Sequence, residues 1–267
     1  MERLFAWLLS ESQTDLWTAG LVAARIAPLT IFAPWLSLKR TPPVLRATLV
    51  FALTLSFAPL AAANLQFDPS GIPAVAYGAW LLREALVGTL FALATAMPLY
   101  ALDWAGRLVD TWRGASLAEV IAPNTGERTS PVGDLYMLMG IALFVTLGGH
   151  RAALAAFAQG LITAPIGQTG FVQGASVWLE SAQLTGSALT MAVAIAAPAA
   201  AAIVVVEVAL GLLARSAPQV PVFFAGMPLR AAAGIGAMLL GLSLLMAQLP
   251  ETFRAAIDVA GGWLERL

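Results

Sequence analysis

Six long apolar stretches constrain how this chain can fold more than any other feature. A helix needs about 20 mostly apolar residues to span the hydrocarbon core of a bilayer. The stretches that meet this rule are 17–38, 44–63, 74–102, 132–149, 184–214 and 229–249. Charged residues make up only 11% of the chain, against about 25% in an ordinary soluble domain. The sequence therefore predicts an all-α membrane protein with about six long hydrophobic helices.

Two further segments are expected to form short helices that do not span the membrane. The stretch 152–166 is apolar but short, as in a re-entrant or interfacial helix. The tail, 251–267, has Phe253, Ile257, Ala260 and Leu264 at helical spacing, so we expect a short amphipathic helix. The N-terminus lacks the basic start and long apolar core of a signal peptide, so we expect residues 1–267 to form a single polytopic membrane domain.

The composition excludes several function classes. A net charge of −1 gives no basic field to attract nucleic acid. The chain has no cysteine and a single histidine, His150, so disulfides, thiolate sites and histidine-rich metal clusters cannot form. The nucleophile-elbow, HExxH, Walker A and dinucleotide-binding motifs are also missing from the sequence. We expect no enzymatic activity, no cofactor and no metal site.

Four charged residues lie inside apolar stretches: Arg25, Arg83, Glu84 and Glu207. Intramembrane charges are costly and are functional candidates by default. Interhelical pairs, or positions at the end of a span, are the favoured interpretation of each one. Arg83 and Glu84 are adjacent, so they should point to different faces of a helix and need not pair with each other.

The distribution of basic residues predicts the topology. A short loop after the first stretch carries Lys39, Arg40 and Arg46. The loops after the third and fifth stretches are also basic, and such loops stay on the cytoplasmic side. This rule places both termini on the outer side of the membrane.

The segment 103–134 is the longest polar connection, and it holds eight charged residues among scattered apolar ones. A loop of this length inside a compact domain is usually functional. Its apolar residues favour a loop that folds back into a cavity among helices, where non-helical backbone is tolerated at membrane depth.

Ala192, Ala196 and Ala200 recur at the spacing that lets helix backbones approach closely in lipid. The pattern fits packing within one subunit and packing against other subunits equally well.

The segment 207–234, EVALGLLARSAPQVPVFFAGMPLRAAAG, resembles the FliR/SctT family of bacterial type III secretion proteins. The stretch from Asp110 to Gly114 and the stretch 123–130 also resemble that family, although Ala122 stands where an Asp is usual. The matching residues of the first segment, which the resemblance implies are a gate assembly motif, are Gly211, Arg215, Pro218, Gln219, Phe223, Gly226 and Pro228, followed by Leu229 and Arg230.

The resemblance implies a subunit of the export gate in the bacterial inner membrane, present as a single copy. It would form a pore for unfolded proteins with R-type (FliP/SctR-like) and S-type (FliQ/SctS-like) subunits. A U-type (FlhB/SctU-like) switch protein and a V-type (FlhA/SctV-like) export ring would be further partners. Residues 1–63 would resemble an S-type helix pair, and 74–267 the R-type helices. A loop would plug the closed channel through Gly106, Leu108, Val109, Asp110, Trp112, Arg113, Gly114 and Ser116.

The segments 127–133 and 148–150 look more like the injectisome branch of the family than the flagellar one. A flagellar FliR-type subunit remains the alternative within the family. A small-solute or ion transporter is the alternative outside it, and it would require several partnered charges at mid-membrane and a repeat across two halves.

Overall fold

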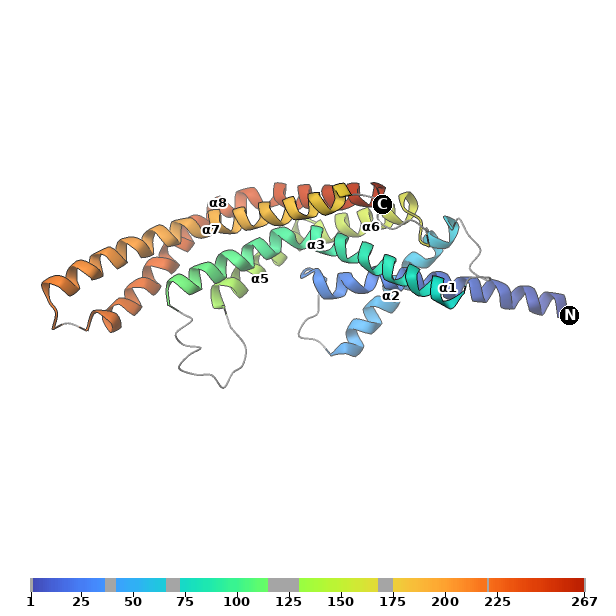
Figure 1. Ribbon diagram of the computed structural model, residues 1–267, viewed down its shortest axis with the longest axis horizontal. Coiled ribbons are helices and arrows are strands. Elements are labelled where there is room, and N and C mark those ends of the chain that lie inside the picture. The colour runs from blue at the N-terminus through green and yellow to red at the C-terminus, as the bar shows by residue number, and fades with distance from the viewer. Residues whose placement is uncertain are drawn as a thin grey trace. The chain divides into compact units, whose positions relative to one another are not determined.

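The computed structural model describes residues 2–36, 42–65, 73–114, 130–167, 175–219 and 221–266. These residues form helices, and no strand occurs among them (Figure 1). The helices are α1 (Glu2–Phe32), α2 (Pro43–Ala63), α3 (Ala74–Trp112), α5 (Pro131–Thr146), α6 (Gly149–Thr163), α7 (Ala175–Ser216) and α8 (Val222–Arg266).

Within the described part of the chain, three helices are long and apolar enough to cross a membrane: α2, α3 and the Val177–Ser216 part of α7. Helices α5 and α6 pass the same test together, but a bend of 69° separates them. The bend falls at Gly148, whose φ of +76° lies in the left-handed region that glycine adopts without steric cost. The predicted all-α membrane fold is therefore confirmed.

The chain divides into two compact units. The first comprises residues 1–96, 144–184 and 253–267, and the second comprises 97–143 and 185–252. This division does not fall between residues 63 and 74, where the sequence placed the change from S-type-like to R-type-like helices. The likeness of those two portions to S-type and R-type subunits stays a prediction.

Aromatic and aliphatic side chains from several helices form the core of the first unit. Phe157 of α6 is fully buried, and its ring lies 5.4 Å from that of Phe57 of α2 and 5.7 Å from that of Phe91 of α3. The end of α8 adds Trp263 and Leu264, both 2% exposed. Burying rings of this size supplies much of the apolar stabilisation of a core.

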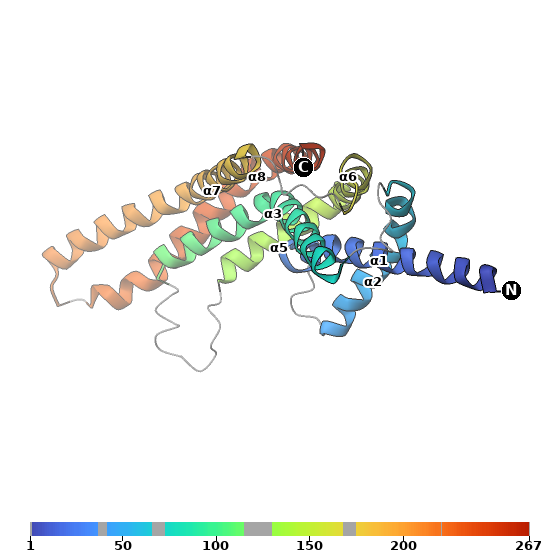
Figure 2. The same cartoon turned by 45° about the vertical axis from the view of Figure 1, so that its right-hand side comes forward.

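In the second unit, the end of α3 packs against α5, and α7 lies beside α8 (Figures 1 and 2). Ala192 and Ala196 of α7 are at most 1% exposed. The small-residue spacing in α7 is thus used, at these two positions, for packing within the chain.

The helices extend further than the hydrophobic stretches indicated. Helix α3 continues to Trp112, so residues 103–112 are helical and not part of an irregular loop. Helix α8 begins at Val222 and is continuous through Pro228 and Pro250. The connection between the apolar stretches 184–214 and 229–249 is therefore shorter than their ends indicated, and the tail 251–267 is not a separate helix. The expected amphipathic face of the tail is present, because Phe253, Ile257, Ala260 and Leu264 are buried.

Candidate functional site

A cluster of polar groups joins the end of α3 to the start of α5. We call it the loop clasp; it consists of Asp110, Arg113, Ser130 and the backbone N–H of Val132. Asp110 Oδ2 accepts hydrogen bonds from Ser130 Oγ at 2.6 Å and from the Val132 N–H at 3.0 Å. Asp110 Oδ1 accepts from Arg113 Nε at 2.6 Å. The clasp therefore connects the two ends of the segment 115–129.

The local sequence explains why the clasp forms at this position. Ser130 precedes Pro131, the first residue of α5, and Ser130 Oγ accepts a hydrogen bond from the Gly133 N–H at 3.1 Å. This arrangement is a serine N-cap followed by proline in the first helical turn, both of which are favoured there. Asp110, in the last turn of α3, then adds a negative charge at the positive end of the α5 dipole.

A close approach of two glycines brings α3 and α5 together beside the clasp. A Cβ atom placed on Gly106 would lie 2.4 Å from the Cα of Gly133. A Cβ atom on Gly133 would lie 2.6 Å from Ser130 Oγ. The two backbones can approach this closely only because neither residue has a side chain.

The structure places most of the predicted plug residues in helix α3. Val109 and Asp110 are buried, whereas Trp112 is 38% exposed. Ser116 lies outside the described residues. The predicted plug residues within the last two turns of α3 or directly after it are Gly106, Leu108, Val109, Asp110, Trp112, Arg113 and Gly114.

A second polar cluster lies in the core of the first unit. Glu84 is fully buried, and its carboxylate accepts from Arg25 Nε at 2.5 Å and from Arg83 Nη1 at 3.0 Å. The backbone N–H of Gly167 donates to the same carboxylate at 3.2 Å. Arg83 and Glu84 do pair, although their positions on the helix did not require it, because the guanidinium of Arg83 is long enough to reach its neighbour's carboxylate.

Arg25 links this cluster to the C-terminal end of α6. Its Nη1 donates to the carbonyl oxygen of Ala164 at 2.9 Å. The free carbonyls at a helix C-terminus carry partial negative charge, which suits a buried cation. The cluster thus joins α1, α3 and the end of α6, and the favoured interpretation of Arg25 and Glu84 as an interhelical pair agrees with this geometry.

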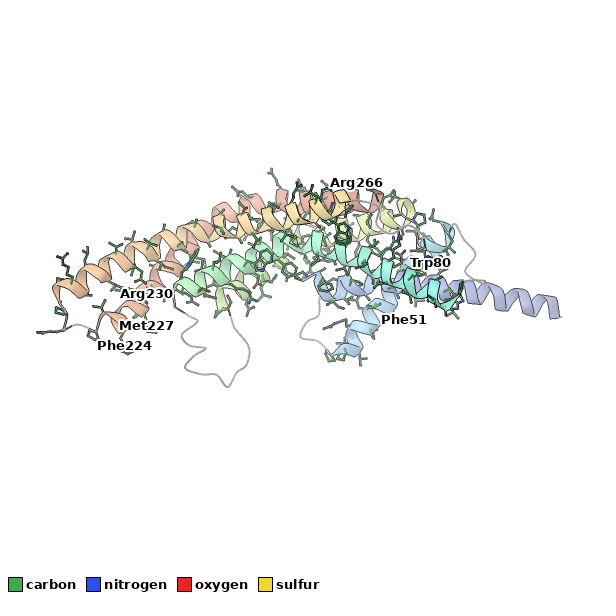
Figure 3. All side chains as sticks on the ribbon, in the orientation of Figure 1. Phe51, Trp80, Phe224, Met227, Arg230 and Arg266 are labelled. Atoms are coloured by element: carbon green, nitrogen blue, oxygen red, sulfur yellow. The ribbon has the colours of Figure 1, made fainter. Side chains whose placement is uncertain are left out.

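The fourth intramembrane charge pairs near the turn between α7 and α8. Glu207 Oε1 lies 2.5 Å from Arg230 Nε, and Figure 3 shows Arg230 beside Phe224 and Met227 at this end of the two helices. The Glu207 side chain is 45% exposed. The pair joins Glu207, which precedes the predicted assembly motif on α7, to Arg230, which follows Pro228 on α8.

The described residues of the assembly motif surround that turn. Gly211 and Arg215 are exposed on α7, and Pro218 and Gln219 form the exposed turn that follows. Gly226 is buried because Leu210 of α7 packs against it. Phe223 and Pro228 lie in the first turns of α8.

Sequence reasoning missed one further polar contact, in the first unit. Glu180, at the start of α7, receives two hydrogen bonds from Arg266, at 2.6 and 2.7 Å, and one from Trp263 Nε1 at 2.8 Å. Arg266 lies in the last turn of α8. These residues are 83 and 86 positions apart, so no local spacing signals the contact.

The described residues include only part of the predicted basic loop and only part of the chain in which a metal site was not expected. Lys39 and Arg40 lie outside the described residues, whereas Arg46 is in the first turn of α2. Within the described ranges, no three histidine, aspartate or glutamate side chains are placed to hold a metal ion.

The chain has long apolar helices, buried charges in ion pairs and a polar cluster that joins α3 to α5. These features define the class of helical membrane proteins. The family model "Bacterial export proteins, family 1" matches residues 16–256. The chain belongs to this family, the FliR/SctT family of export proteins, as its resemblance indicated.

Three relatives represent the branches of the family. The chain is 31% identical to Yop proteins translocation protein T of Yersinia pestis, over 82% of this chain and 84% of that protein. It is 28% identical to the flagellar biosynthetic protein FliR of Pectobacterium carotovorum, over 78% and 79%. It is 26% identical to the surface presentation of antigens protein SpaR of Shigella flexneri, over 74% and 75%.

Proposed function

We propose that this chain is a subunit of a type III secretion export gate in the bacterial inner membrane. The match to the bacterial export family over residues 16–256 carries the proposal, because it includes helices of both compact units. The role is structural: with R-type and S-type subunits, the chain forms a pore for unfolded proteins. A U-type switch protein and a V-type export ring are its further partners.

The paired charges support a gate over a small-solute or ion transporter. Proton-coupled transport uses carboxylates that can change their protonation and partners at mid-membrane. The carboxylate of Glu84 is held by two arginines and a backbone N–H, and Glu207 is held by Arg230. Each of these two carboxylates therefore has an arginine partner in the structure.

The relatives include both branches of the family at similar identity. The segments 127–133 and 148–150 favour the injectisome branch over the flagellar one. In either branch the energy for export comes from outside this chain.

We propose further that the connection between α3 and α5 plugs the closed channel. Its test should spare the helical residues, because Val109 and Asp110 are buried and their removal would disrupt the packing of α3. Residues 115–129 are therefore replaced by about six Gly and Ser residues, a linker that reaches about 20 Å. The hydrogen bond between Asp110 and Ser130 shows that the ends of this segment are close enough to be joined.

The replacement should leave assembly with the R-type and S-type subunits intact and should make the purified complex conduct ions in planar bilayers. An assembled complex with unchanged conductance would show that the connection does not plug the channel. If neither the variant nor the unmodified chain assembles with those subunits, the result would argue against the gate proposal itself.

A further inference from the structure

Helix α1 changes from polar to apolar within a single turn. Residues 11–15, Glu-Ser-Gln-Thr-Asp, are all polar, and the apolar part of the helix is Leu16–Phe32. Five consecutive polar residues cover every face of an α-helix, which has about 3.6 residues per turn. The hydrocarbon core of a bilayer offers such a ring of polar groups no partners. From Leu16 to Phe32, in contrast, only the buried and paired Arg25 carries a charge.

The start of α3 lies against this boundary in α1. The rings of Tyr77 and Trp17 meet edge to face, with their centroids 4.4 Å apart. The Tyr77 hydroxyl donates to the carbonyl oxygen of Trp17 at 3.1 Å. Gly20 leaves room for this contact, because a Cβ atom there would overlap the Tyr77 hydroxyl. The first turn of α3 is therefore beside the first apolar turn of α1.

The order of the helices agrees with a boundary that α1 and α3 share. The apolar part of α1 extends about 25 Å, close to the thickness of the hydrocarbon core, and α2 is long and apolar enough to cross it. A chain that crosses by α1 and returns by α2 begins α3 on the side where α1 began. A helix start suits that level, because its first N–H groups lack partners within the helix and need water or headgroups.

We propose that the Trp17–Tyr77 pair lies in the headgroup region of the bilayer and contacts lipid there. Tryptophan and tyrosine concentrate at this level because each joins an apolar ring to a polar group. Trp17 is 37% exposed, and Leu16 and Val75, in the same turns of α1 and α3, are 72% and 86% exposed. These aliphatic side chains contact the upper part of the acyl chains.

The polarity of α1 favours lipid over a partner protein as the occupant of this surface. A partner subunit would cover one face of the helix, whereas the change at Leu16 takes in the whole circumference, as the edge of a bilayer does. The proposal goes beyond the export gate, because it concerns where the first unit meets the membrane whichever subunits join the chain.

Nitroxide labels on single cysteines test the depth of this surface. The chain has no cysteine, so each label occupies one known site. Gly78→Cys places it next to the aromatic pair, at an exposed position where a Cβ atom meets nothing within 4 Å. Leu82→Cys is the matched site, because Leu82 is 60% exposed on the same face of α3, about 6 Å further along the helix.

The full-length variants are reconstituted in phospholipid vesicles without other subunits, so that the result does not depend on the gate proposal. Power saturation in electron paramagnetic resonance then measures the access of oxygen, which enters the hydrocarbon, and of a water-soluble nickel chelate. We expect the Gly78 label at headgroup level, within reach of the nickel chelate. The Leu82 label should lie about 6 Å deeper, with more access for oxygen and less for nickel.

Three other results would overturn the proposal. Equal nickel access at both sites would place this face in water, and oxygen-dominated access at both would place the boundary elsewhere. Low access for both reagents at Gly78 would show that protein covers the face. Val75→Cys, at an 86% exposed position in the same turn, gives the same readout if Gly78→Cys does not fold.

Discussion

At the scale of single residues, the carboxylate of Glu84 is a buried charge that depends on its charged partners. It is fully buried between two arginines, and one of these also binds the end of α6. A buried ion pair adds little net stability, but removing one partner leaves an uncompensated charge. Here the removal of Glu84 would leave two buried guanidiniums without their anion.

Glu84→Gln should therefore destabilise the chain by about 3–5 kcal/mol. Thermal unfolding in detergent, followed by circular dichroism, measures the change. Glu207→Gln is the control, since Glu207 is 45% exposed and an exposed pair contributes about 0–1 kcal/mol. Equal losses for the two variants would contradict the role given to burial.

At the scale of the elements, the contact between α3 and α5 depends on two glycines. A methyl group at Gly106 would lie 2.4 Å from the backbone of Gly133, so the helices would have to separate. Gly186 of α7 is the control, because a Cβ atom there meets nothing within 4 Å.

Gly106→Ala should lower the unfolding temperature and weaken the protection of α5 amides in hydrogen exchange. Gly186→Ala should be neutral or stabilising by roughly 0.5–1 kcal/mol, because alanine favours a helix interior over glycine. Matching protection of α5 in both variants would show that the close approach is unimportant.

The apolar stretches predict which segments of this chain are helical better than they predict where each helix begins and ends. Apolar stretches mark the helices, but the charges at 103–112 suggest a loop. In the structure Asp103 pairs with Arg107 of the same helix, and Asp110 pairs with Arg113 directly after the helix end. Pro250 suggests a boundary, although the amphipathic spacing of 253–264 continues the same helix. Proline is tolerated in such helices when neighbouring groups satisfy the freed carbonyl.

The candidate site is predictable from sequence only in part. Arg25, Glu84 and Glu207 stand out because charges are rare in apolar stretches. Their partners do not, since the pairs of Arg25 with Glu84 and of Glu207 with Arg230 join residues 59 and 23 positions apart. The loop clasp escapes prediction for the same reason, because Asp110 and Ser130 meet only once α3 and α5 lie side by side.

At the scale of the whole molecule, α2 and α7 expose many apolar side chains that the chain itself does not cover. Only 11% of the apolar window of α2 is buried within the chain, and Phe51 and Leu55 are more than half exposed. On α7 the corresponding share is 22%. Surfaces of this kind need lipid or other subunits to cover them.

The measurement that tests the export-gate proposal most directly is native mass spectrometry of the tagged chain, co-expressed with its neighbouring R-type and S-type genes and purified in mild detergent. We expect one copy of this chain in a complex with several copies of both other subunits. A lone monomer or a homodimer, obtained although both partners are expressed, would contradict the gate and favour an independent transporter.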